Sequence, residues 1–145
     1  MIGEYWQRFC KQHKIDLKTP YTAWAFGATD EEANRLADLV NRKIKTATTS
    51  AYELYGDEPL PKVGEYNIIL NSAEEPVCVV QTKVVEIVPY EQISVEHAYH
   101  EGEGNRSYSY WRKVHNAFFE AEYHEANKQF YPQAPMVCEV FEKVE

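Results

Sequence analysis

Apolar residues recur every three to four positions in several stretches of the chain, and this spacing predicts amphipathic helices. Helices are expected over residues 4–14 and 30–42, in a short segment capped by Ser94, and from residue 108 onward. The second is the clearest: Thr29 or Asp30 can cap its first turn. Its buried face carries Ala33, Leu36, Ala37 and Val40.

Five other stretches are rich in β-branched and aromatic residues, which favour strands. They cover residues 21–27, 46–50, 65–70, 77–88 and 136–144. Helices and strands do not alternate regularly along the chain. This order predicts an α+β fold with a mostly antiparallel sheet, arranged as a small β-barrel with helices packed outside, rather than a doubly wound parallel sheet.

The composition narrows the class of protein. A chain of 145 residues is expected to form one domain with its own core. Its three cysteines contain no CxxC pair, which fits a reducing compartment and buried, unpaired thiols. No apolar run approaches the roughly 18 residues of a membrane span, and the first residues lack an apolar signal core. We therefore expect a cytoplasmic protein without a membrane partner.

The formal net charge of -8 argues against broad, non-specific binding to nucleic acid, which requires a basic face. One small basic pocket on an acidic body remains compatible with this charge. Aromatic residues make up 14% of the chain. Such a content suits either a packed core or a surface on which bases stack, and composition does not choose between them.

The segment Glu101-Gly102-Glu103-Gly104-Asn105-Arg106-Ser107 is a polar loop directly before a predicted helix. Polar groups held on a loop before a rigid element often build a site, although a solvated turn with a helix cap is the simpler interpretation. The loop is not a calcium-binding loop, because Arg106 and Arg112 occupy the required glycine and glutamate positions. It is not a dinucleotide fingerprint either, because Ser107 stands at the third glycine. The histidines show no zinc-ligand spacing.

A basic and hydroxyl-rich cluster follows the second helix. Arg42 and Lys43 are explained as cations at a helix C-terminus, whereas Lys45 lies at the start of a strand and is a candidate ligand for a phosphate or an oxyanion. Lys45 and Thr48 are three residues apart, so in a regular strand they would point to opposite faces. They would share a site only if Lys45 lies before the strand or a bulge intervenes.

The stretch Lys43-Ile44-Lys45-Thr46-Ala47-Thr48 resembles the signature Gly-x-Lys-x-x-(Ser/Thr) of the ASCH domain, a PUA-like β-barrel family. Lys43 stands where the family has glycine. The segments 24–27, 32–40 and 97–119 also resemble the family, closest to a bacterial subgroup with the Glu-Gly-Glu-Gly and Trp-Arg pattern. The resemblance implies an ASCH domain over residues 20–145, with residues 1–19 as an N-terminal helical extension packed on it.

Three activities are implied by this resemblance. One is a non-catalytic RNA-binding module. Another is an amidohydrolase that removes the acetyl group from 4-acetylcytidine, whose Lys, Thr and Glu carry over to Lys45, Thr48 and Glu101, with Glu103 as a rival. The third is a ribonuclease on single-stranded RNA, in which Glu101 or Glu103 would bind a divalent metal and Lys45 a phosphate. Only the ribonuclease would need a cofactor.

The chemistry of the amidohydrolase assigns a role to each of its three residues. Thr48 would supply the nucleophilic hydroxyl, Lys45 would act as base or stabilise the oxyanion, and Glu101 would carry protons to the leaving amine. The expected ligand is a nucleoside, a nucleotide or a short single-stranded RNA. Further substrate contacts are expected from the loop and from two stacking aromatic residues: Glu103, Asn105, Arg106, Ser107, Trp24 and Tyr52.

Overall fold

The computed structural model describes residues 1–145, and every helix and strand expected from the sequence is present within a few residues. The helices are α1 (Ile2–His13), α2 (Asp30–Asn41), α3 (Val95–Glu101) and α4 (Tyr108–Glu125). The strands are β1 (Tyr21–Ala25), β2 (Ala47–Ala51), β3 (Tyr66–Leu70), β4 (Pro76–Pro89) and β5 (Pro135–Lys143). Because α3 extends to Glu101, this residue ends a helix, and the polar loop begins at Gly102.

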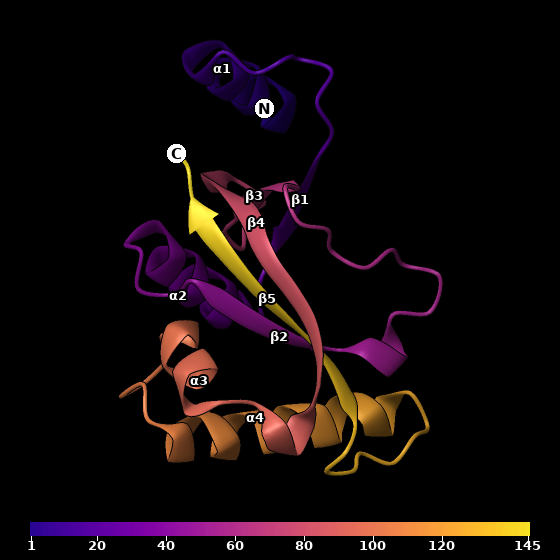
Figure 1. The fold of residues 1–145 in the computed structure, drawn as a ribbon. Helices are drawn as coiled ribbons and strands as arrows, with labels where there is room; N and C mark the ends of the chain where they lie inside the picture. Colours follow the sequence, from indigo (N-terminus) through magenta and orange to yellow (C-terminus); the bar gives the residue numbers. More distant parts are fainter.

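The five strands form one sheet in the order β1-β3-β4-β5-β2 (Figure 1). The pair β1–β3 is parallel, and the other three pairs are antiparallel. The predicted α+β class with a mostly antiparallel sheet is therefore confirmed. The predicted closed barrel is wrong, because the edge strands β1 and β2 do not pair with each other. Side chains from both edges line a common cavity instead, so the sheet curls without closing.

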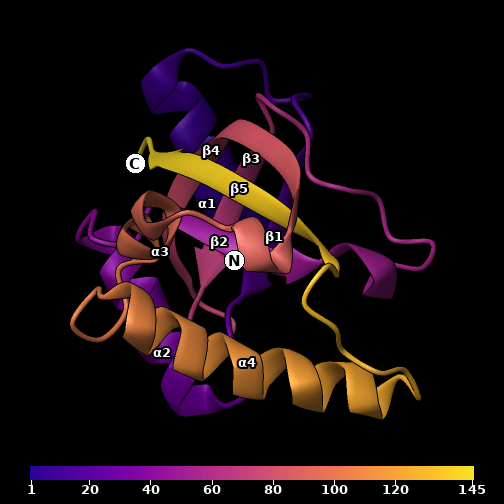
Figure 2. The ribbon, with the colours of Figure 1, turned by 60° about the horizontal axis from the view of Figure 1, so that its bottom comes forward.

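Helices cover both faces of the sheet. Successive residues of β3 point to opposite faces, and Ile69 packs with α2 whereas Ile68 packs with α1. In Figure 1, α1 and α4 lie at opposite ends of the sheet, and Figure 2 shows α4 crossing one side of the molecule. The apolar residues of α4 join those of β5 in the largest core cluster, which includes Trp111, Phe119 and Met136.

The first helix docks on the sheet through three buried residues, Trp6, Phe9 and Cys10. All three cysteines are unpaired and buried, as the sequence predicts. Burial raises the pKa of the Cys78 thiol to about 11 and that of Cys138 to about 12, so both stay protonated and unreactive at neutral pH. None of the helices has both the length and the apolar character required to cross a membrane.

A Schellman motif ends α2 and positions the segment that carries Lys45. The backbone N–H of Lys43 donates to the carbonyl of Val40 at 2.9 Å, and that of Ile44 donates to the carbonyl of Leu39 at 2.9 Å. Lys43 has a φ of 63°, in the left-handed region that glycine adopts most readily. The glycine of the family signature is thus replaced here by a lysine that keeps the backbone conformation.

We expect Lys43→Gly to be more stable than Lys43→Ala by about 1 kcal/mol in the free energy of unfolding. An L side chain in the left-handed region costs about 1–2 kcal/mol that glycine avoids. Both variants lose the same charge from the end of α2, so the comparison isolates the backbone term. Denaturant unfolding of the two variants measures it. Equal stability of the two variants would contradict a strained Lys43.

Candidate functional site

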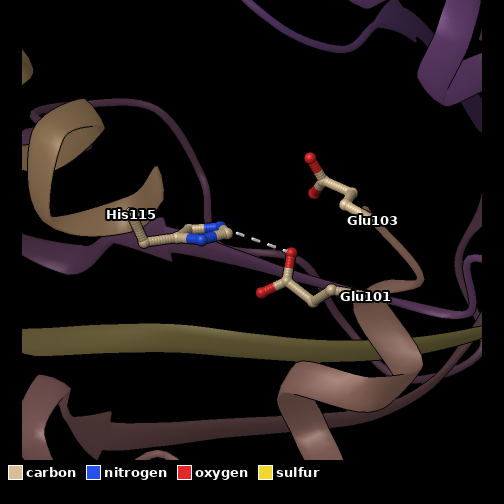
Figure 3. A group of neighbouring side chains, drawn as sticks. All are labelled: Glu101, Glu103 and His115. Carbon is tan, nitrogen blue, oxygen red and sulfur yellow. Dashed lines mark ion pairs between the residues drawn. The ribbon is translucent and has the colours of Figure 1, made fainter. Parts of the chain in front are cut away.

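Lys45 meets Glu101, the last residue of α3, and Glu103 of the polar loop in the interior between β2, α3 and α4. The ammonium Nζ of Lys45 lies 3.2 Å from Oε1 of Glu101 and 3.5 Å from Oε2 of Glu103. Lys45 is 2% exposed and Glu101 is 1% exposed. Figure 3 shows Glu101 and Glu103 beside His115 of α4. The structure thus brings Lys45 and Glu101 together, as expected for a shared site.

The remaining contacts of Lys45 bind it to the protein backbone. Its Nζ donates to the carbonyl of Ala47 at 2.9 Å and to that of Glu101 at 3.3 Å. An ammonium has three N–H donors, and these are used by the two carbonyls and by Oε1 of Glu101. Lys45 therefore has no free donor for the phosphate of a bound RNA in this arrangement.

The carboxylate of Glu101 accepts hydrogen bonds from two further side chains. Its Oε2 accepts from Thr49 Oγ1 at 2.6 Å and from Trp111 Nε1 at 2.8 Å. Burial alone would raise the pKa of Glu101, but the Lys45 charge and the His115 and Thr49 hydrogen bonds hold it well below its ordinary value. Glu101 is therefore an ionised, saturated acceptor and not a proton donor at neutral pH.

The pKa values of the two histidines near Glu101 are shifted in opposite directions. Thr49 gives its only hydroxyl proton to Glu101, so it must accept from Nε2 of His97, 2.9 Å away. Burial lowers the pKa of His97 despite the nearby carboxylate. His115 donates from Nδ1 to the carbonyl of Trp111 at 2.9 Å and directs Nε2 to Oε1 of Glu101 at 3.6 Å. Burial opposes the charge on His115, yet Glu101 raises its pKa above the ordinary value.

The raised pKa of His115 predicts that the protein loses stability as the pH rises. The stabilisation is complete below the unfolded pKa of about 6.5 and disappears as the pH passes through the higher pKa of the folded state. We expect the free energy of unfolding to fall more between pH 6.5 and 9 in the wild type than in His115→Gln. Denaturant titrations across that range test this, and parallel pH profiles of the two proteins would contradict it.

Glu101, Glu103 and His115 offer ligand atoms within 4.8 Å of one another, which is the spacing of a metal site. The same two carboxylates, however, already surround the ammonium of Lys45, and Glu101 also accepts from Thr49 and Trp111. A divalent ion would place its charge beside that ammonium and displace these hydrogen bonds. The residues present therefore do not fit the divalent metal that a ribonuclease activity implies.

The polar residues after Glu103 shape the loop. Asn105 Oδ1 accepts from the backbone N–H of Ser107 at 3.0 Å, and Ser107 caps α4 by accepting from the N–H of Tyr110 at 3.1 Å. The guanidinium of Arg106 lies over the ring of Tyr99, 3.7 Å from its centroid, and donates to the Tyr99 carbonyl. These contacts connect the loop to α3 and α4.

Thr48 does not join Lys45 and Glu101. Lys45 lies before β2, and the alternation of that strand turns Thr49 toward Glu101 and Thr48 toward the opposite face. The sequence prediction selected Thr48 from the family signature and missed Thr49. The signal that marks Thr49 is the alternating pattern of β2, in which Ala47, Thr49 and Ala51 are the buried positions.

Thr48 instead lines a cavity of about 570 Å³ between the two edges of the sheet. Trp24 of edge strand β1 lines the same cavity, whereas the exposed Tyr52 does not. Tyr55 contributes the aromatic ring that was expected from Tyr52. The lining residues come from four strands and the loop after β2: Thr22, Ala23, Trp24, Thr48, Ser50, Tyr55, Glu58, Pro59, Leu60, Pro61, Glu65, Asn67 and Glu139.

A directed chain of hydrogen bonds lies along the cavity wall. Trp24 Nε1, which can only donate, gives its proton to Oδ1 of Asn67 at 3.0 Å, so the amide Nδ2 faces Thr82 Oγ1 at 3.3 Å. Thr82 then donates to Oε2 of Glu139 at 2.7 Å. Thr22 also donates to Oδ1 of Asn67. Each hydrogen bond in this series, from Trp24 through Asn67 and Thr82, therefore donates in the direction of Glu139.

Glu139 has no cationic partner in the protein. It is 8% exposed, and Thr82 donates its only side-chain hydrogen bond, leaving Oε1 unpaired. Burial and the charge of Glu65 raise its pKa, while the Thr82 hydrogen bond lowers it. Sequence reasoning missed Glu139, Asn67 and Thr82. The sequence feature that could have identified them is a polar residue at an inward-facing position of a strand that is otherwise apolar.

The comparisons with known proteins agree on one family. The family model of the ASCH domain matches residues 22–145. The crystal structure of an ASCH domain from Lactobacillus crispatus JV V101 superposes with a TM-score of 0.87 at 31% identity, covering 97% of this chain and 94% of that chain. Protein EF3133 from Enterococcus faecalis V583 gives a TM-score of 0.84 at 38% identity, covering 97% of this chain and 90% of that chain. No curated protein matches the chain.

Proposed function

The chain belongs to the ASCH domain family, and on this premise we propose that it binds the base of a nucleoside, a nucleotide or a short RNA in the cavity between the edges of its sheet. The observation that carries the proposal is the indole of Trp24 in the wall of that cavity, anchored through Nε1 by Asn67. Stacking on an aromatic ring is the common way for proteins to hold an unpaired base.

The size of the cavity supports a ligand of this kind. Its volume of about 570 Å³ lies within the roughly 300–1,000 Å³ typical of small-molecule sites. The apolar wall is supplied by Leu60 and its flanking prolines, and most of the other lining residues carry hydroxyl, amide or carboxylate groups that can hydrogen-bond to a base. A single base with its sugar is a better match than a longer segment of RNA.

The charge of the cavity determines which part of the ligand enters it. Glu58, Glu65 and Glu139 line the cavity, and no Lys, Arg or His does. A phosphate would be repelled there, so the base enters and the phosphate of a nucleotide or RNA stays outside. The net charge of -8 also disfavours long RNA, because neutralising many phosphates needs many cations.

We expect Trp24→Leu to weaken nucleoside binding about 10–100-fold, since stacking contributes roughly 1–3 kcal/mol per base. Tyr52→Leu is the matched control: it removes an aromatic ring that is 44% exposed and outside the cavity, and the affinity should stay unchanged. Calorimetric titration with the four common nucleosides, their 5′-monophosphates and a five-nucleotide single-stranded RNA measures both effects. Failure of all these ligands to bind the wild type at millimolar concentration would overturn the proposal.

Amide hydrolysis of a modified nucleoside such as 4-acetylcytidine is a second candidate. It is favoured by the position of Thr48, which lines the cavity directly across the strand pair from Glu139. A hydroxyl beside a carboxylate is the arrangement that general-base activation requires. Lys45 and Glu101 do not line the cavity and are 2% and 1% exposed, so a ligand there would not touch them.

Chromatography of 4-acetylcytidine incubated with the protein separates the two candidates. Release of cytidine by the wild type and its loss in Thr48→Val would support the hydrolase. Binding without turnover, with or without added divalent metal, would support a module that binds a base and does not catalyse a reaction. The same incubation with a short single-stranded RNA tests the ribonuclease.

A further inference from the structure

We propose that Glu139 selects the ligand by accepting an N–H from an exocyclic amino group of the base. This inference rests on the proposed function, because it concerns the same cavity, and it names the chemical feature of the base that the cavity recognises.

The direction of the hydrogen bonds makes Glu139 the terminal acceptor of the wall. The indole of Trp24 is a donor only, and this fixes the amide of Asn67 with its oxygen toward Trp24 and its nitrogen toward Thr82. Thr82 is 0% exposed and passes its hydroxyl proton to Oε2 of Glu139. The other oxygen, Oε1, receives no hydrogen bond from the protein. A ligand in the cavity therefore meets an open acceptor.

The charge around Glu139 leaves this acceptor to the ligand. No Lys, Arg or His side chain forms an ion pair with Glu139, although it is 8% exposed. Buried carboxylates are normally paired or well hydrogen-bonded, because leaving them unpaired is costly. Glu101, on the other face of β2, is a buried carboxylate of the usual kind: Lys45, Thr49 and Trp111 are its partners. The contrast assigns a ligand-facing role to Glu139.

The shape of the cavity restricts the amine to one carried by a flat ring. Trp24 borders one part of the cavity, and the Pro59-Leu60-Pro61 segment borders another. The indole cannot turn freely, because Asn67 holds its Nε1 and the ring of Phe26 packs edge-on against it at 4.6 Å. A flexible alkyl amine would reach Glu139 but would not use this aromatic surface.

Matched nucleosides that differ in an amino group test the inference. We expect the wild type to bind the amino-bearing member about tenfold tighter in at least one of three pairs: cytidine over uridine, adenosine over purine riboside, or guanosine over inosine. Glu139→Gln, which can still accept from Thr82, should reduce that ratio to within about twofold. Glu142→Gln removes the same charge from an exposed position of the same strand that does not line the cavity, and it should keep the ratio of the wild type.

The outcomes separate this inference from the function on which it rests. Failure of the nucleosides, their 5′-monophosphates and the short RNA to bind would overturn the proposed function itself. Binding of nucleosides without preference for the amino group in any pair, or a preference that survives in Glu139→Gln, would overturn only the role of Glu139. Tighter binding of spermidine than of every nucleoside would also overturn it, because the cavity would then recognise charge rather than an amino-substituted ring.

Discussion

Replacing Lys45 with methionine is expected to lower the free energy of unfolding by about 3–5 kcal/mol, the usual cost of removing one partner from a buried ion pair. Methionine keeps most of the length of the side chain, so the effect comes from the lost charge. The variant would leave Glu101, which is 1% exposed, without its cationic partner. It would also leave the carbonyl of Ala47 without the donor that Lys45 supplies at 2.9 Å.

Denaturant unfolding of Lys45→Met beside Lys43→Met gives the matched comparison. Lys43 is an exposed lysine on the same segment. Its replacement by methionine should change the free energy of unfolding by no more than about 0.5 kcal/mol. In a double-mutant cycle, Lys45→Met combined with Glu101→Gln should cost less than the sum of the two single variants, because the second change removes the unpaired charge. A loss below about 1 kcal/mol for Lys45→Met would show that Lys45 is not a stabilising partner.

The outcome bears directly on function, because a large loss of stability is the behaviour of a structural lysine. A variant of Lys45 would then lose any activity through unfolding, and its inactivity would say nothing about catalysis. Activity assays of Lys45 variants are informative only at a temperature where the folded fraction has been measured. Thr48, Trp24 and Glu139 line the cavity, so their variants report on ligand contact more directly.

The helices and strands could be predicted because each depends on local spacing. The apolar face of α2 and the alternation of β2 are visible within a dozen residues, and the structure reproduces both. The meeting of Lys45 with Glu101, in contrast, joins residues 56 positions apart. It was expected from the family resemblance, because no local pattern relates the two segments.

The cavity could not be predicted, because it depends on how far the sheet curls. Trp24 on one edge strand and Thr48 on the other line the same space only because β1 and β2 approach without pairing. Asn67 and Glu139 lie in apolar strands, where a single polar residue resembles a tolerated exception. Their hydrogen bonds through Thr82 cross three strands, and strand order is not encoded in any one of them.

Gly102→Ala is expected to destabilise the protein by about 2–5 kcal/mol, the sum of about 1–2 kcal/mol for a left-handed L residue and about 1–3 kcal/mol for overpacking. Gly102 has a φ of 76°, and a Cβ there would lie 2.7 Å from the carbonyl oxygen of Ile44 and 3.0 Å from Cα of Lys45. Both are backbone atoms, so they cannot rotate away. The segment carrying Lys45 would have to move from Glu101.

Gly56→Ala isolates the contribution of this close approach. Gly56 has a φ of 59°, but a Cβ there meets nothing within 4 Å. Its substitution should therefore cost only the left-handed term, about 1–2 kcal/mol. The excess cost of Gly102→Ala over Gly56→Ala, measured by denaturant unfolding, is the energy of holding the end of α3 against the Lys45 segment. Equal costs would mean that the backbone of Lys45 moves freely, and the glycine after Glu101 would then serve only to end a helix.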